Sequence, residues 1–177
     1  KLINTRPEEP VPYQVLTQLQ LSQGKSADAQ LTATMMRDKP KLRAPGWLLL
    51  GDVLAQTDHK ADALKAYAEA AKAGAPEPAL LHKTELLDRT GEEHIANKEL
   101  GAWLTAHPDS IAALSLAARR EVRRQNHAAA AKYYEAIVKR EPKNFVALNE
   151  LAWTYTKLKN PASLATAKAA VELAPEN

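Results

Sequence analysis

The sequence predicts an all-α protein built as a solenoid of about five stacked helical hairpins. Three observations support this prediction. Apolar and small residues recur every 33 or 34 residues, and prolines and glycines fall between the recurring segments. The composition also suits a folded helical protein, with 45% apolar residues, 25% charged residues and only six glycines in 177. We therefore expect one continuous elongated array in which each hairpin contacts its neighbours.

The clearest copy of the repeated unit lies in residues 44–76. In its first helix Trp47, Leu50 and Leu54 are spaced at i, i+3 and i+7, so they form one apolar stripe. Gly51 lies beside this stripe and lets a second helix approach where any Cβ would hold it away. A single pair of helices cannot bury both of its faces, so copies of the unit must stack.

The second helix of that copy alternates small and large residues along its seam. Ala63, Tyr67 and Ala70 follow one another at about one turn. The small residue also marks the period, because Ala29 and Ala63 are 34 residues apart and Ala63 and Ala96 are 33 apart. A landmark that repeats at one spacing on successive helices indicates a repeated structural unit.

The first unit begins at Pro10, since proline suits the first turn of a helix, and its first helix is expected to end near Gly24. Its second helix, which carries Ala29, ends before Pro40. Residues 1–9 are expected to be a polar lead-in or the tail of a preceding repeat.

The third unit follows Pro76, turns at Thr90 and Gly91, and closes at Pro108. Its seam is less regular than that of the preceding copy. It is one residue shorter than its neighbours in the connecting loop, and both of its helices keep their length.

The fourth and fifth units repeat the pattern once more, since Leu114 and Leu148 are 34 residues apart and Tyr134 takes the seam position. The last helix is expected to open with Pro161 in its first turn and to close at Pro175. The predicted units are residues 10–43, 44–76, 77–110, 111–144 and 145–177.

The repeated unit resembles the tetratricopeptide repeat (TPR), whose signature of about 34 residues is W-x2-L-G-x2-Y, then A-x3-F, then a closing P. The matching residues are Trp47, Leu50, Gly51, Ala63, Tyr67 and Pro76. The resemblance implies a right-handed superhelix whose concave groove is lined by the first helix of each repeat. The sequence departs from the pattern at Lys83, Thr84, Glu121 and Ser163.

The last unit has a narrower resemblance. Residues 147–153, 160–161 and 169–177 are similar to the TPR-repeat lipoproteins that accompany exosortase and PEP-CTERM protein sorting in exopolysaccharide-producing Gram-negative bacteria. This resemblance implies a secreted, lipid-anchored periplasmic protein of many repeats, of which this chain is a fragment. A cytoplasmic TPR adaptor is the alternative.

The sequence offers little support for catalysis, a metal or a cofactor. It contains no cysteine, and none of its five histidines forms an i, i+4 pair with another. No Ser/His/Asp order or glycine-rich phosphate loop is present, and exposed loop or helix-end positions explain the histidines. A net charge of +3 is too small to indicate nucleic acid, and no apolar run approaches the length of about 20 residues that spans a membrane.

The TPR resemblance nominates groove residues at about the second, fifth, ninth and twelfth positions of each repeat. In chain order these are Gln14, Gln18 and Leu21; Leu48, Asp52 and Ala55; Leu81, Glu85 and Asp88; Ser115, Arg119 and Val122; and Asn149, Trp153 and Thr156. Only Asn149 loosely matches the carboxylate clamp of chaperone-binding TPR domains, so we do not expect a chaperone C-terminus as ligand.

Arg119 and Arg123 lie one turn apart on the groove side of one helix, in a segment that also contains Arg120 and Arg124. Like charges at this spacing repel, so an acidic partner segment held by bidentate contacts would explain them. The alternative is that neighbouring carboxylates, such as that of Glu121, neutralise the arginines.

Trp153 is either an exposed anchor for a partner or a packing residue between repeats. Together these features predict a protein–protein interaction scaffold that holds an extended peptide or partner segment, without enzymatic activity. A carbohydrate-polymer-contacting module of an export system is the second hypothesis, although the few aromatic residues disfavour it.

Overall fold

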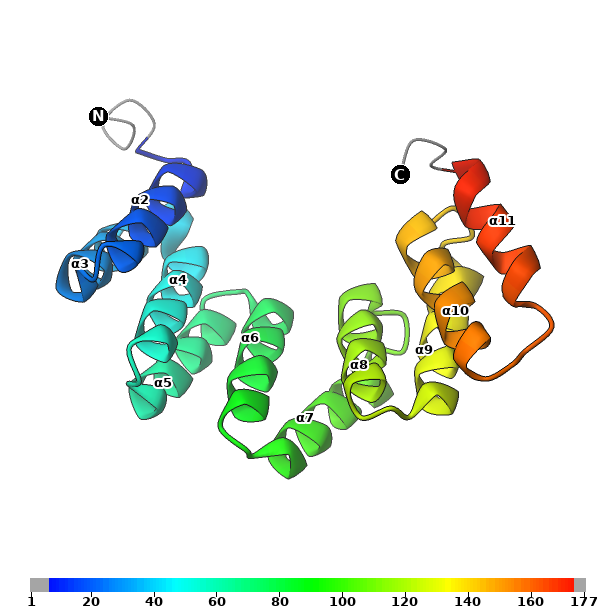
Figure 1. The fold of residues 1–177 in the computed structure, drawn as a ribbon. Coiled ribbons are helices and arrows are strands. Elements are labelled where there is room, and N and C mark those ends of the chain that lie inside the picture. The colour runs from blue at the N-terminus through cyan, green and yellow to red at the C-terminus, as the bar shows by residue number, and fades with distance from the viewer. Residues whose placement is uncertain (1–6, 174–177) are drawn as a thin grey trace. The chain divides into compact units, whose positions relative to one another are not determined.

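The computed structural model describes residues 7–173, which form helices joined by short turns (Figure 1). The fold is all-α, as predicted: ten α-helices pack in sequential pairs within this range, with one short 3-10 turn, η1, before α4. None of these helices is long and apolar enough to cross a membrane. The helices are α2 (Pro10–Ser22), α3 (Ser26–Arg37), η1 (Pro40–Leu42), α4 (Arg43–Gln56), α5 (Lys60–Lys72), α6 (Pro76–Arg89), α7 (Glu93–Ala106), α8 (Ile111–Arg123), α9 (His127–Arg140), α10 (Phe145–Lys157) and α11 (Ser163–Leu173).

The chain divides into two compact units, unit 1 (Lys1–Glu99) and unit 2 (Leu100–Asn177), with the division inside α7. In unit 1, helices α2 to α6 each pack against the next, and α4 also contacts α2 and α6. In unit 2, helices α8 to α11 pack in the same sequential way. The division of the whole chain into one continuous array of five repeats stays a prediction.

A fully buried alanine marks the seam of four successive hairpins. Ala29, Ala63, Ala96 and Ala130 are each 0% exposed and occupy the same repeat position. At the neighbouring position on the facing helix, Gly51 lies so close to Tyr67 that a Cβ added to it would be 2.4 Å from the Tyr67 Cε1 atom. The close helix approach expected at Gly51 is therefore confirmed.

The turn inside each hairpin uses one backbone conformation. The residue in the left-handed region is glycine in two hairpins, at Gly24 and Gly91 with φ of 73° and 77°. In the other three it is Asp58, Gln125 and Lys159, with φ of 61°, 60° and 54°. In all five, the next residue donates its N–H to a carbonyl five residues earlier, the pattern of a Schellman motif.

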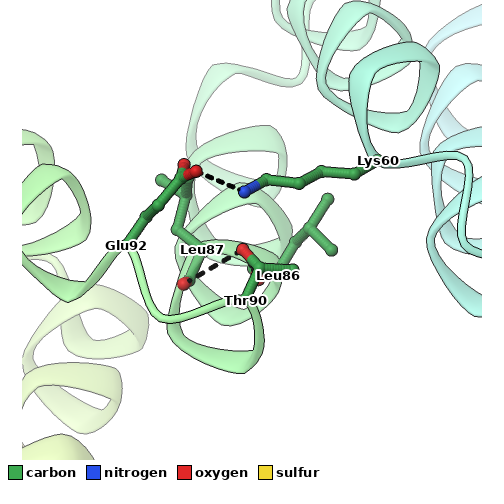
Figure 2. Close-up of polar contacts among 5 residues, drawn as sticks. All are labelled: Lys60, Leu86, Leu87, Thr90 and Glu92. Atoms are coloured by element: carbon green, nitrogen blue, oxygen red, sulfur yellow. Dashed lines mark hydrogen bonds and ion pairs between the residues drawn. The ribbon is translucent and has the colours of Figure 1, made fainter.

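Contacts between neighbouring turns hold the hairpins of unit 1 in register. Lys60, at the start of α5, places its Nζ 2.5 Å from Oε1 of Glu92 in the next hairpin turn (Figure 2). Thr90 donates its hydroxyl to the Leu86 carbonyl at 3.1 Å, and Thr57 makes the equivalent bond one repeat earlier. These bonds satisfy carbonyls that a helix end leaves without a partner.

The start of the last helix differs from the prediction. Pro161 was expected in the first turn, but α11 begins at Ser163, and Pro161 lies in the preceding turn. The Asn160 side chain accepts a hydrogen bond from the Ala162 N–H at 2.9 Å, so it organises a turn that delays the helix. Pro175, the expected end of the unit, lies outside the described residues.

Candidate functional site

The first helices of three successive hairpins, α2, α4 and α6, form a hollowed surface in unit 1. One hollow of about 390 Å³, the α2–α4 hollow, is lined by Gln14, Val15, Thr17, Gln18, Leu21, Leu49, Asp52, Val53 and Gln56. A second of about 250 Å³, the α4–α6 hollow, is lined by Asp52, Ala55, Gln56, Tyr67, His82, Glu85, Leu86 and Arg89. Because Asp52 and Gln56 line both, the two hollows adjoin, and we call them together the unit 1 groove.

Asp52 lies at the centre of this groove and joins three helices. Its Oδ1 atom accepts a hydrogen bond from the Tyr67 hydroxyl of α5 at 2.9 Å. The same oxygen lies 2.6 Å from Nδ1 of His82 on α6. The Tyr67 and His82 rings also contact each other in a tilted arrangement, with centroids 5.8 Å apart. The cluster therefore fixes the position of the Asp52 carboxylate.

The cluster shifts the pKa of both partners of Asp52. The hydrogen bond to Asp52 raises the pKa of His82, although burial opposes the shift. Burial, and then the nearby Asp52 carboxylate, raises the pKa of Tyr67. Tyr67 thus keeps its proton and remains a donor to Asp52 across the physiological range. His82 takes up a positive charge at a higher pH than an unperturbed histidine does.

The far edge of the groove is formed by the end of α6. Arg89 donates from Nη2 to the Ala55 carbonyl at 2.8 Å, which satisfies one of the free carbonyls at the end of α4. Glu85 is exposed one turn before Arg89 and lines the same hollow. The groove thus carries charges of both signs near α6, but only the carboxylate of Asp52 near α2.

The structure brings together six of the nine groove residues nominated in unit 1. Gln14, Gln18, Leu21, Asp52, Ala55 and Glu85 line the two hollows. Leu48 instead packs against the buried cluster that contains Tyr67 and Ala79. Leu81 and Asp88 are half-buried outside the lining.

In unit 2 the nominated residues are distributed over exposed and half-buried positions. Arg119, Arg123, Asn149, Trp153 and Thr156 are exposed, whereas Ser115 and Val122 are half-buried. Val122 packs against the core of unit 2. Whether any of these residues binds a partner stays a prediction.

The arginine-rich helix α8 has partners within the protein. Glu121 accepts from Nη1 of Arg124 at 3.1 Å and from the Asn126 side chain at 2.7 Å. Arg119 and Arg123 also make further interactions of their own, so an acidic ligand is not needed to balance them. The neutralisation considered in the sequence is observed directly for Arg124.

Trp153 is both a packing residue and an accessible one. Its ring meets His127 of α9 edge-on at 5.4 Å between centroids, and Lys157 Nζ lies 5.1 Å from the ring centre. The residue nevertheless remains 42% exposed. Its contact is with the preceding hairpin, whereas packing against the following repeat was the alternative expected.

Comparison with known proteins shows similarity in structure alone. No protein-family model matches the sequence, and no curated protein matches it. The TPR protein YrrB, described as having an unusual peptide-binding site, superimposes with a TM-score of 0.58 at 16% identity over 99% of this chain and 92% of its own. MamA from Desulfovibrio magneticus RS-1 gives 0.61 at 16% identity, over 95% of this chain and 96% of its own. Cut9, from the APC/C hetero-tetramer Cut9–Hcn1, gives 0.57 at 19% identity, and this chain covers 35% of it.

The chain has the TPR solenoid fold. In the terms of the TPR pattern, Tyr67 and Tyr134 occupy the aromatic position of the second helix, two repeats apart. Burial raises the pKa of Tyr134 to about 12, with Glu150 adding to the shift and Arg119 opposing it. These two charged residues occupy the repeat positions of His82 and Asp52, with the charges exchanged.

The His82 contact was not foreseen from the TPR pattern. The histidines were expected at exposed loop or helix-end positions, but His82 lies within α6 and is half-buried against Tyr67 and Asp52. It follows the nominated groove position Leu81 by one residue. A repeat-by-repeat comparison of residues next to groove positions could have found it.

Proposed function

We propose that this protein is an interaction scaffold that binds an extended peptide or partner segment in the unit 1 groove. The observation that carries the proposal is the pair of adjoining hollows along α2, α4 and α6, with a fixed carboxylate at their junction. Three glutamine side chains beside apolar walls supply donors and acceptors for a peptide backbone, which is a suitable lining for a peptide. The similarity to YrrB supports the choice of ligand class.

A binding role fits the α4–α6 hollow better than a catalytic one. A histidine bonded to an aspartate there would suit a general base, but the lining contains no serine, threonine or cysteine that it could activate. Tyr67 donates its proton to Asp52 and stays protonated because its pKa is raised. Within the described residues, no group of three or more His, Asp or Glu side chains could hold a metal ion.

We further propose that the scaffold works in a bacterial envelope assembly linked to exopolysaccharide production and PEP-CTERM protein sorting, in the periplasm. This context rests on the resemblance of residues 147–153, 160–161 and 169–177 to the lipoproteins of those systems. An acidic partner segment near Arg119 and Arg123, both exposed on α8, belongs to the same proposal. Fractionation of the source cells against compartment markers tests the location, and recovery with cytoplasmic markers would favour a cytoplasmic adaptor.

The test of peptide binding is selection of a random displayed peptide library on the full chain, followed by fluorescence anisotropy with the selected peptides. Gln56→Trp fills the junction of the two hollows and should weaken binding about tenfold or more, since the peptide would lose its contacts there. Gln23→Trp, at an exposed residue outside the lining, is the matched control.

Equal binding to both variants would contradict a site in the unit 1 groove. Binding of anionic oligosaccharides alone, lost in Trp153→Ala, would favour the carbohydrate-contacting alternative.

A further inference from the structure

The α2–α4 hollow has an unusual balance of charge and polarity. Asp52 is its only formally charged lining residue. The remaining lining consists of three glutamines, one threonine and four apolar side chains. A negative charge at one end of an otherwise neutral, partly apolar hollow is complementary to a long side chain with an apolar stem and a cationic head.

The Asp52 carboxylate has capacity for one more donor. Both of its hydrogen bonds, to Tyr67 and His82, use Oδ1. Within residues 7–173 no donor is bonded to Oδ2. An ionised carboxylate accepts through both oxygens, so a cationic head in the α2–α4 hollow would complete its hydrogen bonding.

Thr17 supplies a second unused polar group in the same lining. Its side chain is 1% exposed, and its hydroxyl has no hydrogen-bond partner within the described part of the chain. A buried hydroxyl without a partner is unfavourable, and it can accept a hydrogen bond from an ammonium or guanidinium group. Across the hollow, Gln56 offers a further acceptor beside Asp52.

We propose that the α2–α4 hollow is a subsite for a lysine or arginine side chain of the bound segment, with Asp52 as the residue that selects the positive charge. Val15, Leu21 and Leu49 would line the alkyl stem. This inference rests on the proposed peptide-binding function and names the chemistry of one residue of the ligand.

His82 makes the selection dependent on pH. The groups that face Asp52 are Tyr67 from α5, and His82, Glu85 and Arg89 from α6, while α2 contributes only neutral side chains to the lining. When His82 is protonated, its charge at 2.6 Å offsets that of Asp52 and competes with a ligand cation. Affinity for a cationic side chain therefore falls as the pH drops through the raised pKa of His82.

The experiment selects displayed random peptides on the full wild-type chain and on three variants. Asp52→Asn removes the charge but keeps the size and an acceptor oxygen for Tyr67. Gln56→Lys leaves Asp52 in place and puts a competing ammonium group beside it. Asp28→Asn, at an exposed residue of α3, removes the same charge away from the groove and is the matched control.

We expect enrichment of lysine or arginine at one peptide position on the wild-type chain and on Asp28→Asn, and loss of that preference on Asp52→Asn and Gln56→Lys. For a selected peptide, replacing the lysine by norleucine should weaken binding to the wild-type chain about tenfold, the effect of one charge-assisted hydrogen bond. The same replacement should change binding to Asp52→Asn by less than about twofold. Between about pH 8 and pH 5, affinity should fall for the wild-type chain and stay level for His82→Asn.

The outcomes separate this inference from the proposed function. Enriched peptides without a lysine or arginine preference, or with a preference that survives in both Asp52→Asn and Gln56→Lys, would overturn the cationic subsite and leave peptide binding intact. Failure of the wild-type chain to enrich any peptide would overturn both. Circular dichroism of each variant confirms that a lost preference is not lost folding.

Discussion

The contact between Gly51 and Tyr67 sets how closely α4 and α5 approach. A Cβ at residue 51 would lie 2.4 Å from Cε1 and 2.6 Å from Cδ1 of the Tyr67 ring. Tyr67 cannot move away freely, because it is buried and its hydroxyl is held by Asp52. The helix spacing and the position of the groove carboxylate are therefore linked through one tyrosine.

Gly51→Ala should destabilise the protein by about 1–3 kcal/mol, the usual cost of overpacking a well-filled core. Gly101→Ala is the matched control, because Gly101 is also within a helix and a Cβ there would meet nothing within 4 Å. The control should be neutral or stabilising by up to about 1 kcal/mol, as alanine favours the helix. Urea unfolding followed by circular dichroism measures both, and equal effects would contradict the close approach.

The His82–Asp52 pair should make stability depend on pH. The folded-state pKa of His82 is raised from the ordinary value of 6.5, so the pair stabilises the fold fully below that value. The stabilisation is lost as the pH rises through the raised pKa. We expect the urea midpoint of His82→Asn to fall further below that of the wild type at about pH 5 than at about pH 9.

His94→Asn, at an exposed histidine of α7, is the control for this pH series. A difference between wild type and His82→Asn that is constant with pH, or that grows toward pH 9, would contradict the assigned pair.

At the scale of the hairpin, the tight turn repeats more faithfully than its sequence does. Gly24 and Gly91 adopt the left-handed conformation without steric cost, but Asp58, Gln125 and Lys159 adopt it with a Cβ present. The hydrogen bond that closes each turn is kept in all five hairpins. The helix packing therefore imposes the turn, and three of the five sequences accept some strain.

Gln125→Gly should stabilise the protein by about 0.5–1 kcal/mol, because relief of the left-handed strain exceeds the extra entropy that glycine loses on folding. Gln23→Gly is the control, since Gln23 has a φ of −92° and should lose stability or stay unchanged on the same substitution. Thermal unfolding of the two variants tests this difference. A lower melting temperature for Gln125→Gly would show that the turn carries no such strain.

The elements were more predictable from sequence than the site. Helix positions followed from the spacing of seam residues such as Ala63 and Ala130, because burial of a small residue is required at each crossing. The start of α11 was wrong, since proline at residue 161 suits a helix start and also suits the turn that Asn160 organises. His82 was missed because its role depends on Asp52, 30 residues away in the previous repeat.

Considered as a whole, the protein keeps one scaffold and varies the chemistry at equivalent positions. The ninth position of successive repeats is Gln18, Asp52, Glu85, Arg119 and Trp153. In unit 1 these residues line the groove, with Asp52 held in place by two neighbours. In unit 2 the same position carries an arginine and a partly packed tryptophan. Variation of this kind on a constant fold is what a surface for a specific partner requires.

The most direct test of peptide binding in the unit 1 groove is a nuclear magnetic resonance titration of the labelled full chain with a selected peptide. The backbone and side-chain amide signals of Gln14, Gln18 and Gln56, and the backbone signal of Asp52, should shift with one common affinity. Signals from the exposed face of α3, such as Leu31 and Met35, should stay in place. Shifts confined to unit 2, or to α3 and α5, would contradict binding in this groove.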